Sequence, residues 1–230
     1  MSLNILAIET STEACSAALL INGEIEERFE LAPRGHGDLI LQMADDLLAH
    51  AALKPQQLTA IAFGRGPGAF TGVRIATSVV QGIALGADLP VVPVSTLAAL
   101  AQGAWRQHQQ RALLCAMDAR MGEVYWGQYA IKDVIEDGFA VQVVEETVCI
   151  PERAPAVNGT GWQGIGSGWQ AYGDALNQRY GQQVTVCDAT ALPRARDVVV
   201  LAAHGFRAGQ AVSAEDALPV YLRDNVVTRP

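Results

Sequence analysis

The chain has 230 residues, of which half are apolar and 17% are charged, and its formal net charge at pH 7 is −8. Only Lys54 and Lys132 are lysines, and the arginines are scattered, so the basic patch of a protein that grips nucleic acid alone is missing. The apolar runs are shorter than a bilayer span, about 18 residues, and MSLNILAIE has no basic signal region. These features predict a cytoplasmic protein with no membrane partner and one large domain or two small ones.

The first 108 residues predict alternating strands and helices. Asn22-Gly23, between two apolar segments, is a strong hairpin signal. Thr71 and Ser95 are candidate helix N-caps. In chain order the predicted elements are strands 3–9, 14–21 and 24–31, a helix over 36–50, strand 58–63, a helix over 71–86, strand 91–94 and a helix over 95–105.

The second half repeats this order of elements at first and departs from it after its third strand. Residues 112–131 predict strand, acidic residue, turn and strand, so that Asp118 takes the place that Glu9 holds in the first copy. Residues 140–148 predict a third strand, but 158–169 carry five glycines where a helix is due. We therefore predict an α/β fold of two pseudo-repeated βββαβα units, 1–108 and 109–230, the second degenerate. A helix beginning near residue 195 could pack back on the first unit.

The segment GRGPGAFTG, residues 64–72, has four glycines in nine residues between a strand and a helix. It has neither the lysine of a Walker A loop nor the position of a dinucleotide fingerprint. Its backbone N–H groups could bind an anion at the helix N-terminus. Gly66 and Gly68 could equally form a tight turn that brings the helix against the sheet. The sequence leaves both interpretations open.

Glu9, Thr10 and Ser11 form a second candidate phosphate loop. An acid that ends a strand, followed by a polar turn and a hairpin strand, is how actin-like ATPases begin, with an aspartate that coordinates magnesium. Glutamate is one methylene longer than aspartate, and a plain polar turn is an equal alternative. Together with Gly66 and Gly68, these residues are a candidate vestigial nucleotide site.

The predicted helices 36–50 and 71–86 are candidates for an interface. Helix 71–86 is apolar or small on nearly every side, which is typical of a helix covered on two sides. The second cover could be another part of this chain or a partner. The predicted contact residues are Leu39, Met43, Leu47, Val73, Ala76, Val80 and Ile83.

Five segments together resemble the bacterial TsaB (YeaZ) family: ILAIETSTEACSAAL, GRGPGAFTGVRIA, PVVPVSTLAAL, DARMGEVYWGQY and PVYLRD. The resemblance covers residues 3–223. It implies an actin/Hsp70/sugar-kinase (ASKHA) fold and a scaffold for the paralogue TsaD, which makes threonylcarbamoyladenosine beside the tRNA anticodon. It also implies docking through helices 36–50 and 71–86, a TsaE-type ATPase in a larger complex, a homodimer when the chain is alone, and only indirect contact with tRNA.

The resemblance also predicts that this chain is not an enzyme. TsaD-type enzymes have a metal-binding HxxxH motif at the start of the helix after the VVPV-like strand, and here Thr96 and Leu100 stand in its place. Leucine cannot bind metal, so no metal and no cofactor are expected. The rival hypothesis is a stand-alone ATPase or small-molecule kinase that uses Glu9. A peptidase is a weaker rival, because no nucleophile elbow or zinc-ligand spacing occurs.

Overall fold

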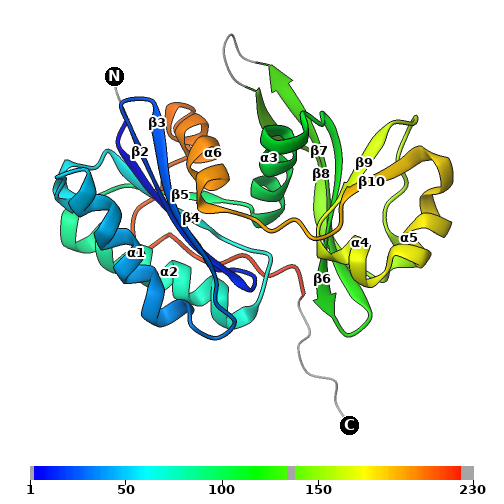
Figure 1. The fold of residues 1–230 in the computed structure, drawn as a ribbon, viewed down its shortest axis with the longest axis horizontal. Coiled ribbons are helices and arrows are strands. Elements are labelled where there is room, and N and C mark those ends of the chain that lie inside the picture. The colour runs from blue at the N-terminus through cyan, green and yellow to red at the C-terminus, as the bar shows by residue number, and fades with distance from the viewer. Residues whose placement is uncertain (1–2, 134–137, 224–230) are drawn as a thin grey trace.

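The computed structural model describes residues 3–133 and 138–223, and it contains two five-stranded sheets. The first has strand order β3-β2-β1-β4-β5, and the second has order β10-β9-β6-β7-β8. Read from β8, the second sheet repeats the order of the first, strand for strand. The pseudo-repeat predicted from the sequence is therefore present in the topology (Figure 1).

The first sheet is mixed. Strand β1 pairs antiparallel with β2 and parallel with β4, while β2–β3 is a hairpin and β4–β5 is parallel. Asn22 and Gly23 have φ values of 53° and 85°, the left-handed pair that a tight hairpin turn requires. The strands are β1 (Ile5–Glu9), β2 (Ala14–Ile21), β3 (Glu24–Leu31), β4 (Ala60–Gly64) and β5 (Val91–Val94).

The second sheet keeps the strands of the repeat but not all of its helices. Between β8 and β9 the described residues form one short 3-10 turn, Pro151–Arg153, where the first half has a 15-residue helix. The predicted degeneration therefore removes a covering helix and leaves the sheet intact. The strands are β6 (Ala112–Arg120), β7 (Glu123–Asp133), β8 (Gly138–Cys149), β9 (Trp162–Ile165) and β10 (Val184–Asp188).

Helices cover both faces of each sheet. Two helices, α1 (His36–His50) and α2 (Phe70–Ala87), pack on one face of the first sheet, and α6 (Ala195–Arg207) packs on the other. The second sheet is covered by α3 (Thr96–His108) on one face and by α4 (Ser167–Ala171) and α5 (Gly173–Tyr180) on the other. Alternate residues of each central strand therefore enter different cores, as a two-residue period requires.

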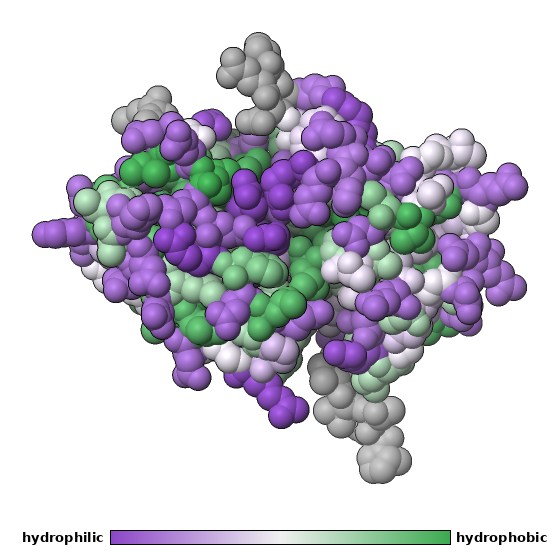
Figure 2. Space-filling model, viewed as in Figure 1, coloured by the Kyte–Doolittle hydropathy of each residue, from purple (hydrophilic) through white to green (hydrophobic). Residues whose placement is uncertain are grey.

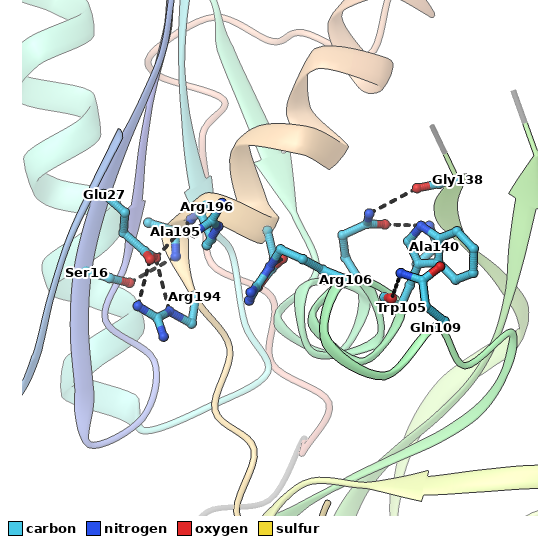
Figure 3. A network of polar contacts seen from close by, with 12 residues as sticks. Ser16, Glu27, Trp105, Arg106, Gln109, Gly138, Ala140, Arg194, Ala195 and Arg196 are labelled. Atoms are coloured by element: carbon cyan, nitrogen blue, oxygen red, sulfur yellow. Dashed lines mark hydrogen bonds and ion pairs between the residues drawn. The ribbon is translucent and has the colours of Figure 1, made fainter. Parts of the chain in front are cut away.

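Helices α3 and α6 lie between the two sheets (Figure 1) and contact each other through an ion pair between Arg106 and Asp197. Figure 3 shows the N-terminus of α6 held by the hairpin of the first sheet. The Ala195 N–H donates to Ser16 Oγ at 2.9 Å, and the Arg196 N–H donates to Glu27 Oε1 at 3.2 Å. The last helix of the chain is thus fixed to the first sheet.

Helix α3 begins as predicted, and α2 begins differently. Ser95 Oγ accepts from the Leu97 and Ala98 N–H groups at 3.1 and 3.3 Å, so Ser95 is the N-cap of α3. Thr71 is not a cap, because α2 begins one residue earlier and Ala69 occupies the cap position. A division into domains 1–108 and 109–230 stays a prediction, and residues 224–230 lie outside the described part of the chain.

Candidate functional site

The β4–α2 loop, residues 64–72, is packed directly on the turn between β1 and β2. A Cβ atom at Gly68 would lie 2.6 Å from Ser11 O, and one at Gly72 would lie 2.0 Å from Thr10 O. The Ala69 N–H donates to Ser11 O at 2.7 Å, and Thr10 Oγ1 donates to Gly72 O at 2.8 Å. These glycines let two backbone segments touch, so close packing accounts for them without a bound anion.

The backbone conformation at residue 66 requires a glycine as well. Its φ is +100°, and a Cβ there would lie 2.7 Å from Val220 O. Its carbonyl accepts from the Thr96 N–H at 3.0 Å, which ties the loop to the start of α3. Of the two interpretations of GRGPGAFTG, the packed turn is the one that these contacts support.

Glu9 is fully buried, and its carboxylate lies against the Gly64 backbone. Oε1 accepts from the Ser11 N–H at 2.6 Å, whereas Oε2 has no hydrogen-bond partner. A Cβ at Gly64 would lie 1.8 Å from Oε2, so glycine makes the room that the carboxylate fills. Burial raises the pKa of Glu9, although the nearby Ser11 and Thr96 act in the opposite direction. A carboxyl group in this position cannot reach a ligand outside the protein.

Glu9 and Asp118 are not equivalent, contrary to the sequence interpretation. Glu9 lies near the beginning of α3, on one side of the first sheet. Asp118 accepts from Tyr172 Oη at 3.1 Å, and its N–H donates to Ser167 Oγ at 3.1 Å, so it faces α4, where it lines the cleft between the two halves. The two acids therefore do not converge on one metal or phosphate.

Glu9→Gln is expected to stabilise the protein more at pH 8 than at pH 5. A raised folded-state pKa means that the contribution of Glu9 to stability is greatest below its ordinary value of 4.5 and falls as pH rises toward the folded pKa. Glutamine carries no charge at any pH, and its amide oxygen can still accept from Ser11. Urea unfolding of wild type and variant at both pH values measures the difference, with Glu24→Gln, on the exposed end of β3, as control. An equal effect at both pH values contradicts the prediction.

A cleft of about 930 Å³ lies between the two halves, beside this packed loop. Its lining includes Phe70 from α2, Tyr125 from β7, Arg120 from the β6–β7 turn, and Tyr221 and Arg223 from the C-terminal segment. The cleft occupies the place between two repeated halves where an actin-like protein would hold a nucleotide. Glu9, a residue of the candidate vestigial phosphate loop, is not part of its lining.

Five of the seven predicted interface residues are buried within the chain itself. They pack with the first sheet and are at most 8% exposed: Met43, Leu47, Val73, Ala76 and Val80. Only Leu39 and Ile83 are partly exposed. The choice of those five as contact residues is therefore corrected, because the apolar faces of α1 and α2 first serve the core. The interface itself stays a prediction.

The surface of α2 carries a different stripe, of small and apolar residues. Ser78, Gly82, Leu85 and Gly86 are exposed, Leu85 by 72%, and no atom lies within 4 Å of a Cβ placed on either glycine. Helix α2 is long and apolar enough to cross a membrane by length and composition alone, a test that the core helix of a soluble protein also passes. Figure 2 shows apolar patches on the half that carries α1 and α2 and where the two halves meet.

The positions aligned with the HxxxH motif are both buried on α3. Leu100 packs in the core between α3 and the second sheet, and the Thr96 hydroxyl is buried without a partner. Among residues 3–133 and 138–223, no three His, Cys, Asp or Glu side chains come together as a metal site would require.

Comparisons with known proteins agree with this architecture. The family model TsaD, described as tRNA N6-adenosine threonylcarbamoyltransferase, matches residues 29–230. The tRNA threonylcarbamoyladenosine biosynthesis protein TsaB of Escherichia coli is 44% identical over 97% of this chain and 96% of its own length. TsaB of Haemophilus influenzae is 42% identical over 98% and 95%. A solved structure, YeaZ from Pseudomonas aeruginosa, superposes with a TM-score of 0.86 at 45% identity, covering 96% of this chain and all of that one.

The two TsaB relatives extend over almost the entire chain, and the YeaZ structure superposes on it closely along its whole length. The predicted family and the predicted ASKHA fold class are both confirmed. The chain belongs to the TsaB (YeaZ) family of tRNA threonylcarbamoyladenosine biosynthesis proteins.

Proposed function

We propose that this chain is a non-catalytic scaffold subunit of the machinery that makes threonylcarbamoyladenosine next to the tRNA anticodon, where it binds a TsaD-type threonylcarbamoyltransferase. The observation that carries the proposal is the exposed face of α2. An 18-residue helix with one charged side chain, Arg74, presents Ser78, Gly82, Leu85 and Gly86 to solvent. Small residues in such a row allow another helix to approach closely, and a contiguous apolar surface marks an interaction site.

The site chemistry supports a structural role. Glu9 is fully buried, and backbone atoms fill the space beside Gly66, Gly68 and Gly72. The Leu100 side chain cannot bind a metal ion. The rival ATPase or kinase would use Glu9 at the phosphates or their metal, and the cleft lining contains Glu13 and Asp118 but not Glu9. A metallopeptidase would need ligands where Thr96 and Leu100 stand.

When the chain is alone, the surface formed by α1 and α2 would pair with the same surface of a second copy. A TsaE-type ATPase would join the larger complex, which would act in the cytoplasm. The net charge of −8 and the scattered arginines favour a subunit that meets tRNA only through its partners.

The test is light scattering after size-exclusion chromatography, on this chain alone and mixed with the TsaD-type protein of the same source. A species of summed mass, formed at the expense of a homodimer, is expected. Two unshifted peaks, with and without nucleotide, would overturn the proposal. Magnesium-dependent ATP turnover by the isolated chain would instead favour the enzyme alternative.

Gly82→Arg is expected to prevent formation of that complex while leaving the fold intact. The Cβ of residue 82 enters open space, so an arginine fits the isolated chain but occupies the surface that a partner helix needs. A charged side chain forced into an interface core weakens binding by about 100-fold or more. Gly173→Arg, at an open position in the second half, is the matched control. Binding by Gly82→Arg equal to that of the control would exclude this face from the interface.

A further inference from the structure

Arg74 is the lone charge on α2 and lies on the same exposed stripe as Ser78 and Gly82, one helical turn from Ser78. Every other residue of this helix is apolar, small or uncharged polar. A single arginine on such a surface is costly to cover unless a partner supplies a matching acceptor, because desolvating an unpaired charge opposes binding.

The arginine is held in place by two aromatic rings. Its guanidinium carbon lies 3.3 Å from the centroid of the Phe70 ring and 4.8 Å from that of Tyr221. The two rings are 6.0 Å apart, and Nη1 donates to the Phe70 carbonyl at 3.3 Å. Stacking of this kind fixes the plane of the guanidinium and leaves most of its N–H groups unused.

Tyr221 belongs to a C-terminal strap, residues 218–223, that connects the two halves at the cleft. The Val220 N–H donates to Arg65 O at 2.8 Å on the first half. On the second half, Arg223 forms an ion pair with Glu123, and its Nη2 donates to Ala119 O at 3.1 Å. The strap therefore sets the position of the ring that covers Arg74.

Within the part of the chain that the structure describes, no carboxylate forms an ion pair with Arg74, whereas six other arginines each pair with one. The guanidinium is thus preorganised for an acceptor that none of the described residues provides. A planar guanidinium binds a carboxylate through two parallel hydrogen bonds, which gives direction as well as attraction.

We propose that Arg74, held by Phe70 and by Tyr221 of the strap, binds an aspartate or glutamate of the TsaD-type partner and thereby fixes the register of the α2 interface. The proposal rests on the proposed function. Two α2 stripes facing each other bring two Arg74 cations and no acid from α2, so a second copy could supply an acceptor only from α1, where Asp38, Asp45 and Asp46 are exposed.

The test compares the affinity of the TsaD-type protein for wild type, Arg74→Glu, Arg74→Lys and a control, Arg207→Glu, at the exposed C-terminal end of α6. Arg74→Glu is expected to weaken binding about tenfold or more, Arg74→Lys by less, and the control by little. Raising the salt concentration should weaken the binding of wild type and strengthen that of Arg74→Glu, because salt screens the attraction in the first and the repulsion between two carboxylates in the second. Rescue of Arg74→Glu by reversing one partner carboxylate to lysine would identify the acceptor.

Tyr221 is tested as a positioning residue. Tyr221→Ala is expected to weaken binding while the melting temperature changes little. Tyr221→Phe, which keeps the ring, is expected to bind with the affinity of wild type. If wild type binds the TsaD-type protein and Arg74→Glu binds equally well, this inference is overturned and the scaffold role stands. An effect of Arg74→Glu on self-association alone also overturns it. If wild type does not bind, the proposed function fails as well.

Discussion

Gly72→Ala is expected to lower the free energy of unfolding by about 3 kcal/mol, near the upper end for overpacking by one methyl group. The added Cβ would lie 2.0 Å from Thr10 O, far inside the ordinary contact distance of about 3.5 Å. The obstacle is backbone on both sides, so no side-chain rotation relieves it. The N-terminal turn of α2 must move away from the β1–β2 turn, and the hydrogen bond from Thr10 Oγ1 to Gly72 O is lost with it.

The matched control is Gly82→Ala on the same helix. Its Cβ enters open space, so the substitution is expected to raise the free energy of unfolding by about 0.5–1 kcal/mol through helix propensity. Urea unfolding of both variants measures the contrast. Because Arg74 follows Gly72 by two residues, Gly72→Ala is also expected to weaken binding of the TsaD-type protein. Equal stability of the two variants would mean that the loop does not pack as described.

Local chemistry explains which elements could be predicted. The Asn22-Gly23 turn fixes both strands beside it, and β2 and β3 were predicted to the residue. Helix α1 was likewise predicted to the residue, because its apolar positions recur at helical spacing. Strands β9 and β10 were missed. Gly164, which weakens a strand signal, sits in β9 because the Trp169 ring lies where a Cβ would be, 2.6 Å away.

The family, and with it the candidate site, could be recognised from motifs. The motifs do not show which sides of α1 and α2 pack on the core. A helix that is apolar on every side gives no periodic signal that separates the core face from the docking face. Met43 and Val80 were chosen because they are large and apolar, and such residues fill the core first. The informative positions were Gly82 and Gly86, because no atom lies within 4 Å of a Cβ at either, so packing among the described residues does not require their small size.

Glu9 shows a second limit of sequence reasoning. An acid at the end of β1 is a magnesium ligand in some proteins and a buried carboxyl group that only fills space in others. The deciding residue is Gly64, 55 positions later, whose missing side chain gives the carboxylate its space. Long-range complementarity of this kind leaves no pattern in one sequence.

Arg106→Met is expected to lower the free energy of unfolding by about 3–5 kcal/mol near neutral pH, because it leaves Asp197 buried without its partner. Asp197 is 1% exposed and receives two bonds from Arg106, from Nε at 2.8 Å and from Nη2 at 2.9 Å. A Cβ at Gly103 would lie 3.1 Å from Asp197 Oδ2, so the glycine lets α6 approach α3 closely. The pair joins the two helices that lie between the sheets, one on each half.

The penalty for Arg106→Met should depend on pH. Burial already raises the pKa of Asp197 above its ordinary value of 3.8, and Arg106 opposes that rise. Without the guanidinium the folded-state pKa rises further, so folding of the variant favours the protonated acid. Its stability is then highest below pH 4 and falls as pH rises toward the new folded pKa. Urea unfolding at pH 5 and pH 8 is expected to give a larger difference from wild type at pH 8.

Two further variants distinguish the contribution of a buried ion pair to stability from that of an exposed ion pair. Arg111→Met breaks a pair whose partner, Asp133, is 71% exposed, and it is expected to cost about 1 kcal/mol or less. Arg106→Met combined with Asp197→Leu removes both charges and should recover most of the lost stability, because the penalty comes from an unpaired buried carboxylate. If the double variant is as unstable as Arg106→Met, the cost lies in the packing of α3 against α6, and the charge of Asp197 is not its source.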